Sequence, residues 1–402
     1  MFLTLGVARI GELVQQATTP NDFTLAAANA ATDQKFAAPD IFPLTTDPQH
    51  PGSPTVSMFR RPIINVNTNF DSSVLWDGRA KIENLRGQVN GAVVTLPLGT
   101  AGDTTLDDHI AAFMTGVYAA QKADKAAGEL DAAGATGGPN NLLALAQSPT
   151  RPCVFEADGT TLTPFVAAVT GGNTEATSTC TPVVPGPGKS AFTLYKAWLN
   201  LSPAGPRNQG RLSIARGEEI FNNFIDAAGG GCTTCHSVPN VGNHQLPTFM
   251  IREGHDSVAR LTAIKDTATA FCTSKGRTSC PEADMIQDMI ERVNVLPLYC
   301  MRPSTDPDSI ASVACLSDPT NDPGDVETTD PGRALVTGHI ADAGKQKPPV
   351  LRNLSVRAPF FHNGDASDMA HLVDFYRFFL RGQFLDMSDQ QVQDLINFLN
   401  AL

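Results

Sequence analysis

The chain has no apolar run long enough to cross a membrane, because a spanning helix needs about 20 consecutive apolar residues. Basic residues are also few: 29 lysines and arginines stand against 41 acidic residues, for a net charge of −12. This balance argues against nucleic acid and anionic membranes as partners. Aromatic residues make up only 7% of the chain, whereas glycine (33) and proline (29) are frequent, so much of the chain is expected to be loop.

One short motif, by contrast, indicates a specific chemistry. Cys232, Cys235 and His236 have the spacing of the attachment site for a c-type haem. The two thiols can add to the two vinyl groups of one porphyrin, and the histidine places an imidazole under the iron as its proximal ligand. A zinc site would need a second cysteine pair nearby, and a thioredoxin-like pair would need a βαβ context. Because neither context is found, the motif predicts one covalent haem c.

The other cysteines indicate disulfides. These six residues fall into close pairs along the sequence: Cys153 and Cys180, Cys272 and Cys280, and Cys300 and Cys315. Pairing by proximity is a hypothesis, because several connectivities are open. Disulfides and haem attachment both favour a periplasmic or otherwise extracytoplasmic location. Residues 1–16 do not form a credible export signal, since Arg9 interrupts a short apolar run, so we expect an N-terminal piece to be missing or the start to be misassigned.

Helical patterns dominate the rest of the chain. Apolar residues recur at helical spacing over 107–127, and 191–201 is expected to form a short helix. Ser213 is predicted to be the N-cap of a helix that carries Gly217 and Phe221 one turn apart. Ser388 opens a capping box in front of an amphipathic C-terminal helix.

A helix with a small residue and an aromatic, then a haem motif, then a final helix that can cross the first, is the cytochrome c layout. We therefore predict a mostly α chain with long irregular loops and two cytochrome c-like domains. The expected domains are 1–205, without a haem-attachment motif, and 206–402, which carries the covalent haem.

Several motifs together resemble the di-haem cytochrome c peroxidases and their relative MauG. In the first half they are Phe59–Pro62 and Trp76–Ala80, and in the second half Lys347–Asn353 and Ala358–Gly364. The segment Thr328–Leu335 looks like an uncharacterised branch of that family. The resemblance implies two facing cytochrome c domains, each with its own haem, and a calcium ion between them.

This chain has one attachment motif where the family has two. The family's first motif lies upstream of the tryptophan segment, so the resemblance implies that 1–205 is the remnant of a domain whose haem segment is lacking. The alternative is a natural single-haem member of the family.

The resemblance also suggests roles for individual residues. Trp76 matches a tryptophan that carries electrons or holes between the haems, although a packed core tryptophan is the alternative. His362 resembles a pocket histidine near the haem edge that acts by hydrogen bonding. The family's glutamate for peroxide cleavage should fall within 88–100, which contains no acid. Peroxidase activity therefore has no obvious proton donor in that stretch.

The sixth ligand of the attached haem falls, by resemblance, fourteen residues after His362, at Tyr376. Peroxidases of the family have methionine there, whereas MauG has tyrosine; a phenol oxygen stabilises high oxidation states and lowers the potential. Tyr376 could instead be a core residue, and Met369 on the same helix is a rival ligand. His371 is expected to face solvent because it points away from the apolar stripe.

For calcium, the matching positions are Asn67 and the carbonyls near Arg357 and Pro359, since oxygen ligands suit this ion. The sequence thus predicts a periplasmic c-type haem oxidoreductase that exchanges electrons with a redox partner protein and carries out peroxide-dependent oxidation. Two alternatives stay open: a single-haem electron-transfer cytochrome without peroxidase activity, and a haem-bearing partner subunit. The oligomeric state is left open.

Overall fold

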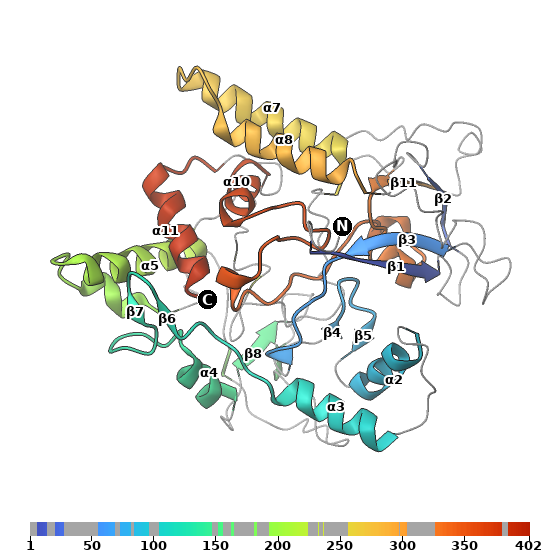
Figure 1. The fold of residues 1–402 in the computed structure, drawn as a ribbon, viewed down its shortest axis with the longest axis horizontal. Helices are drawn as coiled ribbons and strands as arrows, with labels where there is room; N and C mark the ends of the chain where they lie inside the picture. The colour runs from blue at the N-terminus through green and yellow to red at the C-terminus, as the bar shows by residue number, and fades with distance from the viewer. Residues whose placement is uncertain are drawn as a thin grey trace. The chain divides into compact units, whose positions relative to one another are not determined.

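The computed structural model describes most of the chain outside several long loops. The described residues are 6–13, 21–27, 55–68, 73–81, 84–95, 104–146, 152–155, 162–164, 181–182, 193–223, 232, 236, 256–296, 298–303, 326–379 and 385–402. Helices predominate among them and the strands are short, as expected for a mostly α chain (Figure 1). None of the described helices is long and apolar enough to cross a membrane.

The chain divides into two compact units, each assembled from separate segments. Unit 1 comprises 1–62, 250–346 and 358–385, and unit 2 comprises 63–249, 347–357 and 386–402. This division differs from the expected boundary at residue 205, which lies inside unit 2. The chain enters unit 2 at residue 63, returns to unit 1 at residue 250 and contributes to both units after residue 347, and a linear change of composition cannot show such returns. The two cytochrome c-like domains stay a prediction.

Unit 1 combines small antiparallel sheets with helices. Its elements are β1 (Ala8–Leu13), β2 (Phe23–Ala27), β3 (Thr55–Arg60), α7 (Val258–Ser274), α8 (Pro281–Val293), β11 (Tyr299–Pro303), β12 (Val326–Thr328), α9 (Ala334–Thr337), η6 (Ile340–Asp342) and α10 (Met369–Phe379). Strand β1 pairs with β3, and β11 lies between β12 and β2. Val56, Met58 and Leu335 belong to the buried core beside these sheets.

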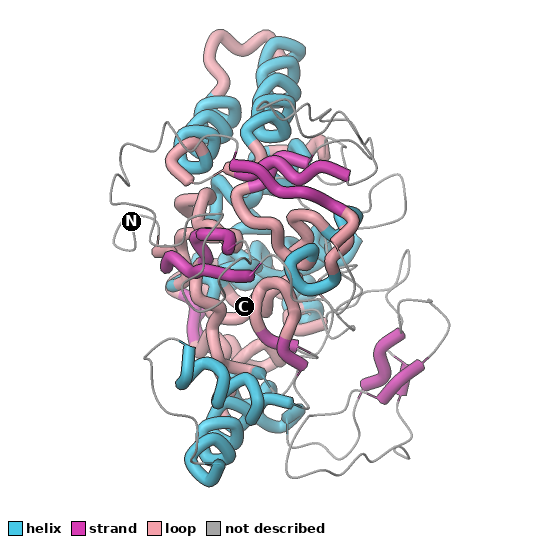
Figure 2. The backbone as a smooth tube through the Cα atoms, turned by 90° about the vertical axis from the view of Figure 1, so that its right-hand side faces the viewer, coloured by secondary structure: helices cyan, strands magenta, loops and turns pink. Residues whose placement is uncertain are grey.

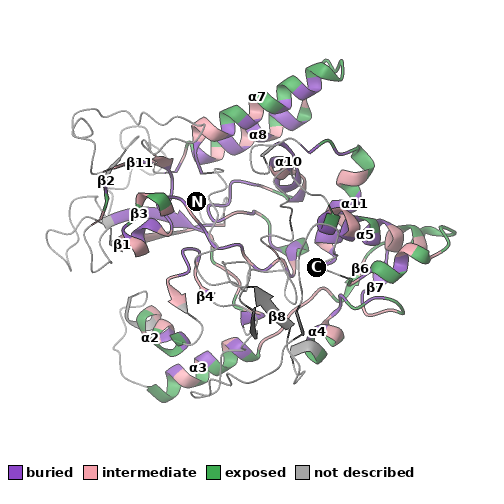
Figure 3. Ribbon diagram, turned by 180° about the vertical axis from the view of Figure 1, so that it is seen from behind, coloured by how far each residue is buried: buried purple, intermediate pink, exposed green. Residues whose placement is uncertain are grey.

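Helices α7 and α8 form a hairpin in which they run side by side (Figures 1 and 2). Their inner faces are buried and their outer faces are exposed, as Figure 3 shows in purple and green. Cys272 and Cys280 are joined by a disulfide across the hairpin end, with their Cα atoms 5.6 Å apart, which is the pairing expected from their proximity. Cys300 is also disulfide-bonded. The side chains of Cys153, Cys180 and Cys315 lie outside the described residues.

Unit 2 contains the elements on either side of the haem motif. They are β4 (Ser73–Val74), β5 (Ala80–Lys81), α2 (Leu85–Thr95), α3 (Thr104–Gly116), β6 (Ala123–Asp124), β7 (Gly128–Glu129), α4 (Pro139–Ala146), β8 (Pro152–Phe155), β9 (Leu162–Pro164), β10 (Thr181–Pro182), η4 (Lys196–Asn200), α5 (Pro206–Asn223), η7 (Leu354–Val356) and α11 (Asp389–Asn400). Leu85 and Val89 of α2 pack on Ala111 of α3. Strand β8 lies between β10 and β9.

The helix boundaries confirm one predicted cap and overturn another. Ser388 accepts a hydrogen bond from the Gln391 backbone and forms the expected capping box of α11. Ser213, however, is not an N-cap: α5 begins at Pro206, and Ser213 is buried in the middle of the helix. Proline suits the first turn because that turn has no use for its missing N–H. Helix α3 ends at Gly116, short of the predicted 127. The described part of 191–201, residues 193–201, forms the 3₁₀ turn η4 rather than an α-helix.

Candidate functional site

Cys232 and His236 lie one helical turn apart in unit 2. The backbone N–H of His236 donates to the carbonyl of Cys232 at 3.0 Å, and Cys232 carries a free thiol. Cys235 lies outside the described residues. A free thiol and an imidazole presented by a single turn are what a covalently attached haem requires. The described residues of the motif therefore fit the expected cofactor.

Aromatic side chains from the two flanking helices lie beside this turn. The Phe221 ring of α5 has its centroid 6.5 Å from that of His236 and 5.4 Å from that of Phe398 in α11. Tyr195 meets Phe398 edge-on at 6.2 Å. These rings form a water-excluding layer next to the predicted iron ligand, which is the kind of surface that a porphyrin packs against.

Gly217 allows α5 and α11 to cross closely. A Cβ at this position would lie 2.0 Å from the carbonyl oxygen of Asp394 and 2.6 Å from the Cβ of Phe398. No side chain larger than hydrogen fits there, because real Cβ contacts essentially never fall under 3.0 Å. The structure thus confirms the predicted crossing of the C-terminal helix over the helix that carries Gly217 and Phe221.

Hydrogen bonds between polar side chains also join α5 and α11 at this crossing. The Ser213 hydroxyl donates to Asp394 at 2.5 Å, and Arg216 donates two hydrogen bonds to the same carboxylate at 2.6 and 2.9 Å. Asn397 donates to the Ser213 oxygen at 2.8 Å. Ser213 therefore acts between helices rather than at a helix end, which explains why its capping role was predicted wrongly.

Glu218 is a fully buried acid next to this crossing, with an exposed fraction of 0%. Its two carboxylate oxygens accept the backbone N–H groups of Leu194 and Tyr195 at 2.5 and 3.0 Å. Burial raises the pKa of Glu218 to about 7, because the loss of hydration outweighs the two hydrogen bonds that favour the charged form. No spacing or motif in the sequence marked this residue.

We expect Glu218→Gln to flatten the pH dependence of unfolding. A carboxyl whose pKa is raised on folding, here from 4.5 to about 7, stabilises the fold fully below 4.5 and loses that contribution as the pH rises through 7. The wild-type free energy of unfolding should therefore fall by up to about 3 kcal/mol between pH 4.5 and 8. Urea unfolding across this range measures it. Glu219→Gln, one position further on, should keep most of the wild-type profile; equal profiles for wild type and Glu218→Gln would contradict the assignment.

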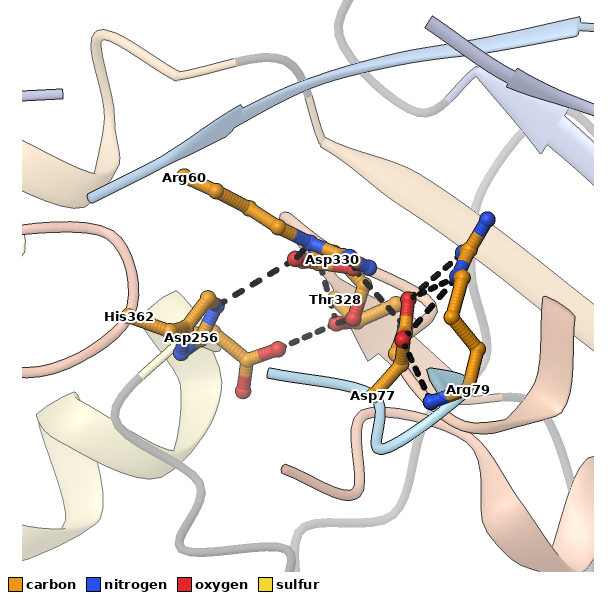
Figure 4. Close-up of polar contacts among 8 residues, drawn as sticks. Arg60, Asp77, Arg79, Asp256, Thr328, Asp330 and His362 are labelled. Carbon is orange, nitrogen blue, oxygen red and sulfur yellow. Dashed lines mark hydrogen bonds and ion pairs between the residues drawn. The ribbon is translucent and has the colours of Figure 1, made fainter. Parts of the chain in front are cut away.

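In unit 1, His362 lies in a buried polar cluster (Figure 4). Arg60 donates two hydrogen bonds to Asp330, at 2.6 and 2.9 Å, and the His362 Nε2 atom lies 4.0 Å from the same carboxylate. Burial alone would raise the pKa of Asp330, but the charge and hydrogen bonds of Arg60 hold it below its usual range. Thr328 extends the cluster by donating to Asp256. A buried imidazole beside an ionised carboxylate can take up or release a proton.

Trp76 is 7% exposed and belongs to unit 2. Its carbonyl accepts the backbone N–H of Lys347 at 2.6 Å, and the following Asp77 is buried and ion-paired with Arg79 at 2.5 Å (Figure 4). Burial of this kind fits a core tryptophan and an electron relay equally well, so both interpretations stay open. The two residues predicted to be catalytic, Trp76 and His362, belong to different units.

Helix α10 of unit 1 carries the proposed sixth ligand. Tyr376 is half-buried, with its ring 5.9 Å from that of Phe361 and 5.5 Å from that of Phe375, and Met369 is 8% exposed. Ligation of the haem iron by Tyr376 and its alternative, ligation by Met369, therefore both stay predictions. His371 does not face solvent: its side chain is only 13% exposed, contacts Ser367, and lies 3.7 Å from an Asp368 oxygen. The apolar stripe indicated the wrong direction because polar neighbours on the preceding loop cover this side of the helix.

The residues predicted for calcium belong to different units, with Asn67 in unit 2 and Pro359 in unit 1. The Asn67 amide is fully buried: its oxygen accepts the N–H of Ala119 at 2.9 Å and its nitrogen donates to the carbonyl of the same residue at 2.8 Å. This pairing joins two backbone segments and gives Asn67 a structural role. The calcium site stays a prediction.

Comparison with known proteins finds a short similarity. No protein-family profile matches the chain. A stretch of 79 residues is 35% identical to the cytochrome c peroxidase Ccp of Escherichia coli (strain K12), covering 20% of this chain and 17% of that protein. The chain thus matches about a sixth of the length of this curated relative, and the similarity supports a relationship to cytochrome c peroxidases. The MauG-like branch stays a prediction.

Proposed function

We propose that this chain is an extracytoplasmic c-type haem oxidoreductase of the cytochrome c peroxidase type. The observation that carries the proposal is the turn from Cys232 to His236, whose imidazole lies beside the Phe221 ring, which in turn packs on Phe398 of the crossing helix. The short similarity to a cytochrome c peroxidase also supports it. Covalent attachment and disulfides favour a periplasmic location.

The residues of unit 2 have distinct tasks in this proposal. Cys232 and Cys235 would hold the haem, His236 would ligate its iron, and the Phe221 and Phe398 rings would exclude water from its surroundings. When bound, the haem supplies a one-electron couple and, where a coordination position is open, a site for peroxide. A redox partner protein supplies or accepts the electrons.

Peroxide-dependent oxidation also needs protons, because reducing one hydrogen peroxide to two waters consumes two electrons and two protons. Residues 88–100 contain no acid for this task. His362, whose Nε2 atom lies 4.0 Å from the ionised Asp330, is our candidate to hold and transfer a proton. Tyr376 would ligate the iron and favour its higher oxidation states, with Met369 as the rival.

A second function, single-electron transfer without peroxidase activity, is favoured by one observation. The sequence contains one haem-attachment motif, and a carrier needs only one haem. A second haem, a calcium ion and a MauG-like oxidation would all require parts of the family's architecture beyond this motif.

The test is the number of covalent haems per chain, by pyridine haemochrome absorbance and intact mass, on protein matured with its own attachment machinery. We expect at least one haem in the wild type and loss of the covalent link to the first thiol in Cys232→Ser. Peroxide-dependent oxidation of a reduced partner cytochrome would select the peroxidase, and electron exchange without it would select the carrier. Wild-type protein without covalent haem would contradict both.

A further inference from the structure

Arg352 is a buried arginine whose charge is not balanced within the described part of the chain. It lies just before η7 in unit 2 and is 2% exposed. One of its terminal nitrogens donates to the carbonyl of Gly137 at 2.8 Å. Its Nε atom is buried and has no hydrogen-bond partner among the described residues. No described carboxylate lies within ion-pair distance of it.

The buried guanidinium of Arg60 shows how such a charge is balanced elsewhere in the described part of the chain. Arg60, 7% exposed, is held by both oxygens of Asp330. For Arg352, burial lowers the pKa, and no carboxylate offsets that loss. Burying a cation without a counter-charge costs several kcal/mol, and one neutral carbonyl does not repay it. An anion is therefore expected at the Nε side of Arg352.

A chain of contacts links Arg352 to the haem motif within unit 2. Arg352 donates to Gly137, and a Cβ on that glycine would lie only 2.0 Å from the Tyr195 hydroxyl oxygen, so the tyrosine hydroxyl sits against this backbone. The Tyr195 ring meets Phe398, which continues through Phe221 to His236. The unbalanced guanidinium thus borders the same aromatic layer that borders the predicted iron ligand.

We propose that Arg352 binds a carboxylate of the haem, one of its two propionate groups, through Nε–H and a terminal N–H. The inference rests on the proposed function, because the haem is what brings this carboxylate. The guanidinium fork matches a carboxylate in two parallel hydrogen bonds, and such pairs are the stronger ones in a buried setting. A buried cation beside the haem also favours the reduced iron, which carries one positive charge fewer than the oxidised iron.

The test compares Arg352→Gln with Arg86→Gln in the haem-loaded protein. Arg86 is an exposed arginine of the same unit, paired with Asp108, so both variants remove one positive charge. We expect Arg352→Gln to lower the midpoint potential, to make it depend on pH between 5 and 8 as the released propionate titrates, and to shift the propionate bending bands in resonance Raman spectra. Arg86→Gln should leave the potential and the bands unchanged.

The outcomes separate this inference from the function on which it rests. Covalent haem with an unchanged potential and unchanged propionate bands in Arg352→Gln would overturn the inference alone, and would mean that an acidic side chain of the protein itself is the counter-ion. Wild-type protein without haem would overturn the proposed function and the inference with it. If Arg352→Gln does not fold, Arg352→Lys keeps the charge but loses the fork; a shifted propionate band supports the inference and an unshifted band overturns it.

Discussion

Gly217→Val is expected to prevent α5 and α11 from crossing and to abolish stable haem incorporation. The new side chain would occupy space already filled by the Asp394 carbonyl oxygen and the Phe398 Cβ, both closer than any real contact allows. Both atoms belong to α11, so they cannot move away from the new side chain unless α11 separates from α5. We expect a loss of about 3 kcal/mol or more in the free energy of unfolding. Urea unfolding followed by circular dichroism, together with haem content, measures the effect.

Gly91→Val is the matched control for that substitution. Gly91 lies inside α2 of the same unit, where a Cβ would meet nothing within 4 Å. Because valine is a somewhat better helix former than glycine, the control should change stability by no more than about 0.5 kcal/mol. Equal stability of the two variants would show that the close helix crossing at Gly217 is wrong.

Asp330→Asn, in unit 1, is expected to lower the free energy of unfolding by nearly as much as Gly217→Val. The substitution preserves shape but removes the charged carboxylate that accepts two hydrogen bonds from the buried Arg60. Breaking a buried pair by removing one partner typically costs about 3 to 5 kcal/mol. Since the pKa of Asp330 is held below its usual range, its stabilisation is present at neutral pH and is lost as the pH falls through the folded-state pKa. Unfolding of the variant should therefore depend less on pH in the acid range.

Asp108→Asn provides the comparison at the surface. Asp108 pairs with Arg86 through the same kind of contact, but both side chains are about half exposed. Water and salt screen such a pair, so we expect no measurable change in stability. If Asp330→Asn were equally harmless, the buried cluster around His362 would not be the ionised arrangement described here.

The one-turn geometry of the haem motif and the local helix signals could be predicted from the sequence. The spacing of Cys232 and His236 requires only one helical turn, and the structure has the hydrogen bond of that turn. The capping box at Ser388 and the small residue at Gly217 are likewise local patterns. The nearest-neighbour pairing of Cys272 with Cys280 succeeded because a short loop keeps the two cysteines close.

Where a local pattern was overruled, a partner from a distant segment was the cause. Ser213 looks like a cap in the sequence, but Asp394, 181 residues later, takes its hydroxyl. His371 was assigned to solvent from the apolar stripe of its helix, yet its side chain is 13% exposed and its Nδ1 atom lies 4.0 Å from Asp288 of α8. Such partners cannot be predicted from the spacing of residues along the sequence, because the energy of a buried polar contact depends on which surfaces meet in the folded chain.

The sequence by itself determined the one-turn spacing of the predicted haem-attachment motif, since that geometry depends on neighbours along the chain. Only the tertiary structure decided which charges are buried and how they are balanced. Arg60 and Asp330 are 270 residues apart, and Arg352 reaches Gly137 across 215 residues. The electrostatic energy of these groups is set by the loss of water around them and by the charges that folding brings near. Composition contains neither quantity, and so the acid at Glu218 and the unbalanced arginine became visible only in the folded chain.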